Sequence, residues 1–110
     1  TSRVERFQRG FKNRISISPS NRSKWDGSNS LSDEVEAIAS DFLGEMSRSG
    51  LIGEPNLMLL EKDGISIGIR NSGTQAKTNV SLRVAAGIAH STAVDAVAKI
   101  SELLRDRLQH

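Results

Sequence analysis

The chain has 110 residues, of which 36% are hydrophobic and 25% are charged, as expected for one globular domain. It has no cysteine, which excludes disulfides and thiolate chemistry, and its two histidines argue against a histidine-based metal cluster. No apolar run approaches the ~20 residues of a membrane span and no signal peptide is visible, so we expect a cytoplasmic protein.

The net charge of +2 hides an asymmetry, because residues 1–30 hold seven Lys or Arg residues against two acids. Such a basic segment could attract a polyanion, but the first 13 residues contain only Phe7 and Phe11 as aromatic partners for bases. We interpret residues 1–13 as a basic linker or partly disordered arm, and residues 14–110 as the folded domain. Because the chain begins with Thr, we expect either a domain excised from a longer protein or a processed chain.

The first half of the folded domain predicts one strand and one helix. Alternation of polar and apolar residues over 14–18 predicts a strand that Pro19 ends. The helix is expected to open at Ser32, where two acidic residues suit the positive end of the helix dipole, and to end at Ser49-Gly50. Its apolar stripe has five members at helical spacing: Val35, Ile38, Ala39, Phe42 and Met46.

The second half predicts strands over 57–60, 65–69 and 79–85, followed by a final helix. Asp63-Gly64, between the first two of these strands, is typical of a tight hairpin turn that requires positive φ. Thr92 opens a capping box for the helix, whose buried stripe is expected to be Val94, Val97, Ile100, Leu104 and Leu108. The order β-α-β-β-β-α predicts an α+β fold, with two helices on one face of a four-stranded antiparallel sheet.

The most specific motif, Arg70-Asn71-Ser72-Gly73-Thr74, lies between the last two predicted strands. Arg70 offers a planar fork of donors suited to phosphate, Ser72 and Thr74 add hydroxyl donors, and Gly73 can take a positive φ that lets backbone N–H groups converge. Asn71 and Lys77 are candidate auxiliary contacts, although Lys77 is equally well read as a solvated lysine. The motif contains no base, nucleophile or metal ligand, so it predicts phosphate binding without chemistry.

Arg-x-Ser-Gly-Thr between two strands resembles the phosphate-binding loop in the C-terminal domain of the α-D-phosphohexomutase family. That family includes phosphoglucomutase, phosphomannomutase and phosphoglucosamine mutase, and its loop commonly reads Arg-Pro-Ser-Gly-Thr-Glu-Pro-Lys. Here Asn71 replaces the first Pro and Gln75-Ala76 replace Glu-Pro, while the anion donors are kept. The resemblance in element order runs from about Arg14 to the end, and it implies a fold similar to a TATA-box-binding-protein-like repeat.

The resemblance implies an isomerase of carbohydrate metabolism, an intramolecular phosphotransferase that interconverts hexose 1-phosphate and hexose 6-phosphate. The phosphoserine and the loop that holds Mg²⁺ would belong to preceding domains of the parent enzyme, absent from this chain. Arg70, Ser72, Gly73 and Thr74 would grip the non-reacting phosphate and help to close the active site. We therefore expect no catalytic residue, metal or cofactor in this domain, no activity of the isolated domain, and a sugar phosphate and the preceding domains as its partners.

Other interpretations remain open at this point. One is a stand-alone module that binds a polyanion or nucleic acid, although nucleic acid is the less favoured partner, and another is a purely structural domain. The alternation of its strand could place Arg83 on the same surface as Arg70. Such a residue more commonly forms a salt bridge, here to Glu61 or another acid. Gly44-Glu45-Met46-Ser47 matches the letters of a sugar-specificity loop from a different domain of the family. We read that match as coincidence, because these letters fall inside the predicted helix.

Overall fold

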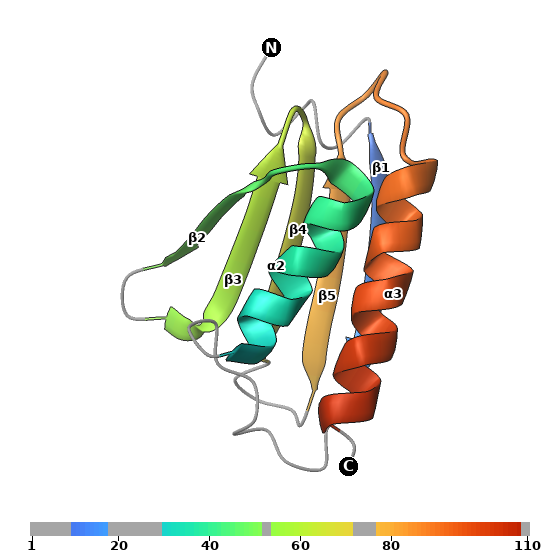
Figure 1. The fold of residues 1–110 in the computed structure, drawn as a ribbon. Coiled ribbons are helices and arrows are strands. Elements are labelled where there is room, and N and C mark those ends of the chain that lie inside the picture. The colour runs from blue at the N-terminus through green and yellow to red at the C-terminus, as the bar shows by residue number, and fades with distance from the viewer. Residues whose placement is uncertain (1–9, 18–29, 52–53, 72–76, 109–110) are drawn as a thin grey trace.

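The computed structural model describes residues 10–17, 30–51, 54–71 and 77–108. These residues form β1 (Phe11–Ile17), α2 (Ser30–Leu43), β2 (Ser47–Leu51), β3 (Glu54–Lys62), β4 (Ile65–Asn71), β5 (Thr78–Val84) and α3 (Ser91–Leu108). The strands make one antiparallel sheet in the order β1-β5-β4-β3-β2. Figure 1 shows α2 and α3 side by side on the same face of this sheet, running in opposite directions. The α+β architecture with two helices on one face is therefore as predicted.

The hydrophobic core lies between the sheet and the two helices. Alternate residues of the central strands point toward the helices and are fully buried, among them Ile67, Ile69, Val80 and Leu82. The predicted stripe of the final helix is confirmed at Val97, Ile100, Leu104 and Leu108, while Val94 is only half-buried. Because both helices cover one side, the sheet keeps a second side that neither helix touches.

The prediction of four strands is wrong, since the sheet has five. The additional strand, β2, forms an edge of the sheet and pairs with β3. Its sequence Ser-Arg-Ser-Gly-Leu has no alternation of apolar residues, because an edge strand need not bury a full face. The register also shifts between Ser49 and Leu51, as in a β-bulge, which weakens the sequence pattern further.

The first helix ends earlier than predicted, at Leu43. Gly44 follows with a φ of +81°, a left-handed conformation that ends a helix. Residues with a Cβ adopt this conformation only with steric strain. The Gly44 N–H still donates to the Ser40 carbonyl at 2.8 Å, and the ammonium of Lys62 on β3 donates to the Leu43 carbonyl at 2.6 Å. The chain thus turns directly from the helix into β2, and Phe42 in the last turn stays 40% exposed.

The placement of residues 44–47 inside a helix is consequently wrong. Met46 is 5% exposed and joins the core as predicted, but it does so from the connection between α2 and β2 rather than from a helical stripe.

β1, β3 and β4 are longer than their apolar alternation predicted, whereas β5 has the predicted length and begins one residue earlier. β1 begins at Phe11, so residues 11–13 of the expected basic arm belong to the sheet, while residues 1–9 lie outside the described residues. The hairpin between β3 and β4 is confirmed: Asp63 and Gly64 have φ values of +44° and +84°. Within the described ranges, no helix is long and apolar enough to cross a membrane.

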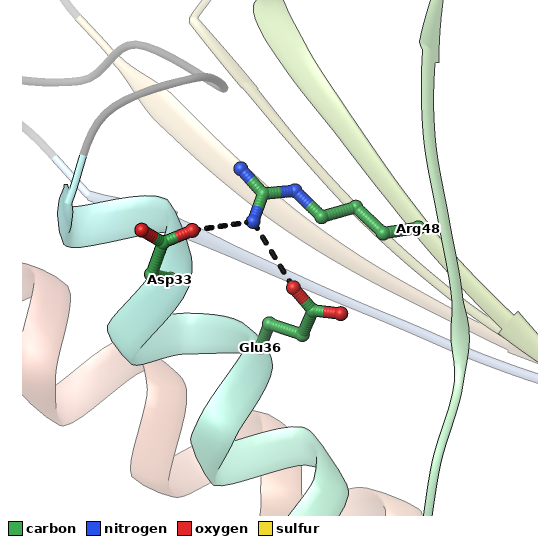
Figure 2. A network of polar contacts seen from close by, with 3 residues as sticks. All are labelled: Asp33, Glu36 and Arg48. Atoms are coloured by element: carbon green, nitrogen blue, oxygen red, sulfur yellow. Dashed lines mark hydrogen bonds and ion pairs between the residues drawn. The ribbon is translucent and has the colours of Figure 1, made fainter.

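Ion pairs tie the layers together on the helix side. Arg48 of β2 places Nη1 2.7 Å from Asp33 Oδ1 and 3.0 Å from Glu36 Oε1 of α2, as Figure 2 shows. The hydrogen bond to Asp33, more than the one to Glu36, raises the pKa of Arg48 above its ordinary value. Arg107 of α3 makes a two-pronged contact with Glu34 of α2, at 2.7 and 3.1 Å.

Candidate anion-binding face

The side of the sheet opposite the helices, here called the open face, is polar and basic. Since Ile67 and Ile69 point into the core, the residues between and after them, Gly68 and Arg70, belong to the open face. The same alternation puts on this face Lys12, Arg14 and Ser16 of β1, Asn79, Ser81 and Arg83 of β5, and Leu57, Leu59 and Glu61 of β3. Four cations therefore share a face with one carboxylate among the residues described there.

Arg70 is the penultimate residue of β4, and its side chain is exposed. It lies opposite Asn79 on β5 and opposite Leu57 on β3. Among the described residues, no ion pair engages its guanidinium. Arg70, the residue predicted as the main phosphate contact, is therefore exposed near the end of β4 on the open face.

The remaining members of the predicted site flank or lie outside this position. Ser72, Gly73 and Thr74 fall outside the described residues. The backbone of Asn71 pairs with Thr78, and Lys77 is exposed just before β5. This pairing holds together the two described residues, one in β4 and one in β5, between which the predicted motif leaves the described part of the chain.

Arg70 does not stand alone, because Arg14 and Arg83 line a hollow with it. The hollow has a volume of about 370 Å³ and is completed by Asn79 and Ser81. This size falls within the ~300–1,000 Å³ typical of small-molecule sites. Three guanidinium groups around one hollow give it a strong preference for anions.

Neutral hydrogen-bonding groups lie between these cations. The Asn79 side chain, 7% exposed, accepts a hydrogen bond on Oδ1 from Ser16 Oγ at 2.8 Å. This contact holds the amide in place and turns its nitrogen, a donor, away from Ser16. Ser81 contributes a hydroxyl in the next row of the same strand. A ligand in the hollow would therefore meet both positive charges and neutral groups that can hydrogen-bond to its hydroxyl groups.

The expected salt bridge of Arg83 to Glu61 is not what the structure shows. Arg83 lies opposite Ser66 on β4, and Glu61 lies opposite Ser66 from the other side, so a whole strand separates the two charges. Arg83 instead lines the hollow with Arg70, the arrangement that its alternation had indicated. Within the described ranges, Arg48 and Arg107 on the helix side are paired with carboxylates, whereas no ion pair engages the three arginines around the hollow.

Arg14 was not predicted as a site residue. The alternation of β1 in the sequence placed Arg14 on the polar side of a strand. Only the pairing of β1 with β5 shows that this polar side belongs to the same sheet face as Arg70. The described residues that line the hollow include no carboxylate, histidine or thiol. In the described part of the chain, no group of three or more His, Cys, Asp or Glu residues could hold a metal ion. The described lining thus offers cations and neutral hydrogen-bonding groups, which suit an anion.

Comparisons with protein-family models, with curated proteins and with solved structures gave no match to this chain.

Proposed function

We propose that this chain binds the phosphate group of a hexose phosphate, as the C-terminal domain of an enzyme of the phosphohexomutase type. One observation carries the proposal: Arg70 is the penultimate residue of β4, two positions before Ser72-Gly73-Thr74 in the sequence, and it lines one hollow with Arg14 and Arg83. Guanidinium groups bind phosphate oxygens through charge-assisted hydrogen bonds, which are about twice as strong as neutral ones. The resemblance of the motif supplies the sugar phosphate as the ligand.

The role we assign to this domain is binding and positioning. A mutase of this type must hold its substrate in two orientations, so a domain that grips the non-reacting phosphate should recognise phosphate rather than one face of the sugar. The planar guanidinium of Arg70 can do so, because it can donate paired hydrogen bonds to a phosphate in either orientation of the ligand. Holding that end in place and covering the cleft would lower the entropic cost of the reaction and exclude water. The phosphoryl-carrying serine and Mg²⁺ would belong to other domains of the parent enzyme.

A second candidate function is the binding of a polyanion such as nucleic acid. The four cations Lys12, Arg14, Arg70 and Arg83 on one open sheet face favour it. The composition of that face disfavours a single nucleic-acid strand. None of its described residues is aromatic, so bases would find no stacking partner there. Phe11, at the start of β1, stacks instead on His90, with ring centroids 4.1 Å apart.

Binding of glucose 6-phosphate and glucose to the chain, measured by isothermal titration calorimetry, tests the proposal. We expect saturable binding of the phosphate ester and none of glucose. Arg70→Ala should weaken binding by about tenfold or more, which corresponds to one charge-assisted contact.

Arg105→Ala is the matched control, because Arg105 is an exposed arginine of α3, in the helix layer. Equal effects of the two substitutions, with both variants folded, would contradict the proposal. So would an affinity for glucose equal to that for its phosphate ester.

A further inference from the structure

We propose that the outer edge of β1 binds an extended acidic segment of another protein, which adds to the sheet as a further strand. In this segment acidic residues would alternate with apolar ones. The acidic side chains would face Lys12 and Arg14 on the open face, and the apolar ones would lie beside Phe11 and Ile15 on the helix side. This surface is an edge of the sheet rather than the hollow, so its partner is independent of the proposed function.

β1 has an unpaired edge among the described strands. The sheet order gives β1 one neighbour, β5, with which all seven of its residues pair in an unbroken register. An edge strand of this kind presents a row of backbone N–H and C=O groups that have no partner in the sheet. Such a row binds an extended polypeptide, because a second strand repeats donors and acceptors at the same spacing.

The two edges of the sheet differ in how they are protected against an added strand. β2, at the opposite edge, has five residues, and its register shifts between Ser49 and Leu51. Short length and a bulge are common ways in which proteins prevent another strand from adding to an edge. β1 shows no register shift along its seven residues, but it carries two cations. β1 is therefore the edge on which a strand can add, and its charges decide which strand.

The two cations of β1 select an acidic partner. Lys12 and Arg14 are two residues apart, so both side chains project from the open face, and both are exposed. Within the ranges that the structure describes, no ion pair engages either side chain. A strand added beside β1 would place residues directly opposite them, where opposite charges stabilise the pairing and like charges weaken it. Glu or Asp at alternate positions therefore fits this edge.

The same charges disfavour a second copy of this chain as the occupant. If two β1 strands paired antiparallel along their full length, Arg14 would lie opposite Arg14 of the other copy. A shift of two residues toward the start of the strand would set Lys12 opposite Arg14 instead. Both arrangements place cations against each other, which destabilises the pairing. The edge is thus protected against itself but not against an acidic strand.

The helix side of β1 supplies the apolar half of the surface. Phe11 and Ile15 are half-buried and pack against the core, so each keeps part of its surface accessible. α3 is the helix that contacts β1, and His90, directly before α3, stacks its ring on that of Phe11 (Figure 1). Apolar side chains of an added strand would bury the remaining surface of Phe11 and Ile15. Alternation of acidic and apolar residues is therefore the pattern that the two sides of the edge select together.

Backbone NMR titration of the chain with a seven-residue peptide, the length of β1, tests the proposal. In this peptide Glu alternates with Val. The control peptides carry Gln or Lys in place of Glu, or group the same Glu and Val residues into two blocks. At about 0.15 M salt, the Glu peptide should shift the amide resonances of β1 that point away from β5. Two cross-strand charge pairs should make it bind about fivefold more tightly than the Gln peptide, and the Lys and block peptides should bind more weakly than the Glu peptide.

Charge variants show where the peptide lies. Arg14→Gln should lower the affinity for the Glu peptide by about twofold to fivefold. Lys12→Glu combined with Arg14→Glu should reverse the preference, so that the Lys peptide binds more tightly than the Glu peptide, a result that misfolding could not produce. Lys99→Gln is the matched control, because Lys99 is an exposed lysine of α3, and it should leave the affinities unchanged. Arg70→Gln should leave them unchanged too, since β5 lies between β4 and β1.

Four other results would overturn the proposal. Equal binding of the Glu, Gln and Lys peptides would show that Lys12 and Arg14 do not select the partner. Peptide binding that is lost in Arg70→Gln would place the carboxylates in the hollow rather than beside β1. Slow exchange of the outward-pointing β1 amides in the chain without peptide would mean that the edge is already paired. Finally, a titration that shifts no β1 amide would mean that the edge accepts no strand. None of these results alters the expected binding of hexose phosphate at Arg70, so the two proposals fail separately.

Discussion

Lys12 of β1 lies directly opposite Arg83 of β5, so two like charges face each other across adjacent strands of the open face. Like charges in this position destabilise a sheet, whereas opposite charges there contribute roughly 0.2–1 kcal/mol of stability. The pair is therefore unfavourable for the empty domain. An anion that binds between the two side chains would relieve the repulsion and recover that free energy as affinity.

Lys12→Glu should stabilise the domain and weaken its anion binding at the same time. The substitution replaces a repulsive cross-strand pair by an attractive one, and we expect a gain of about 0.5 kcal/mol in the free energy of unfolding at low salt. Urea denaturation measures the gain, which 0.5 M NaCl should reduce, since salt at that level screens exposed charges strongly. Lys12→Gln should give a smaller gain. A loss of stability in Lys12→Glu would show that Lys12 and Arg83 do not repel each other.

Ser101→Ala should also stabilise the domain. Ser101 is completely buried in α3, and its Oγ has no hydrogen-bond partner in the structure as described. Leaving a buried hydroxyl unsatisfied costs about 1–3 kcal/mol, so its removal should raise the free energy of unfolding by about 1 kcal/mol. Ser40→Ala in α2 is the control for helix propensity, because Ser40 is only half-buried and should gain no more than about 0.5 kcal/mol. Equal gains at the two positions would mean that burial of the Ser101 hydroxyl carries no penalty.

Arg48→Ala should destabilise the domain without affecting anion binding. Arg48 joins β2 to α2 through Asp33 and Glu36, on the side of the sheet away from the hollow. Since the Asp33 side chain is 71% exposed, the ion pairs are screened, and we expect a loss of about 1 kcal/mol that shrinks with added salt. Double-mutant cycles with Glu36→Gln measure the coupling. A normal unfolding curve together with impaired phosphate binding in Arg48→Ala would place Arg48 in the site instead.

Arg70→Lys should bind glucose 6-phosphate nearly as weakly as Arg70→Ala. Lysine keeps the charge but cannot form the two parallel hydrogen bonds of the guanidinium fork. We expect a loss of about tenfold in affinity for each variant. Ser72→Ala and Thr74→Ala should each cost less, because a neutral hydroxyl contributes nearer ~1 kcal/mol. Full retention of binding in Arg70→Lys would show that Arg70 acts only as a point charge.

Local patterns were sufficient to predict several features of the fold. Asp63-Gly64 predicted its hairpin because few sequences accept positive φ at two successive positions. The spacing of Val97, Ile100 and Leu104 predicted the buried side of α3 because helical periodicity is regular over a long segment. The end of α2 was mispredicted because Met46 continued the apolar spacing past Gly44, while the positive φ of Gly44 ended the helix.

The candidate site was only partly predictable, for a different physical reason. Arg70 belongs to a motif whose residues are adjacent in the sequence, so the sequence alone indicated an anion contact there. Arg14 and Arg83 join it through strand order and register, which depend on β1 adding to the far side of β5 rather than to β3. No local pattern contains that information, and it is what turns three separate arginines into one hollow.

The pairing of β1 with β5 also has a consequence for the order of folding. β2, β3, β4 and β5 follow one another in both the chain and the sheet, so their contacts close short loops. β1 reaches β5 only through contacts such as that of Ser16 with Asn79, which are 63 residues apart. Non-local pairings of this kind close large loops and form slowly. We therefore expect Lys12 and Arg14 to join the basic surface late in folding, after the hairpin β4–β5 has brought Arg70 and Arg83 onto one face.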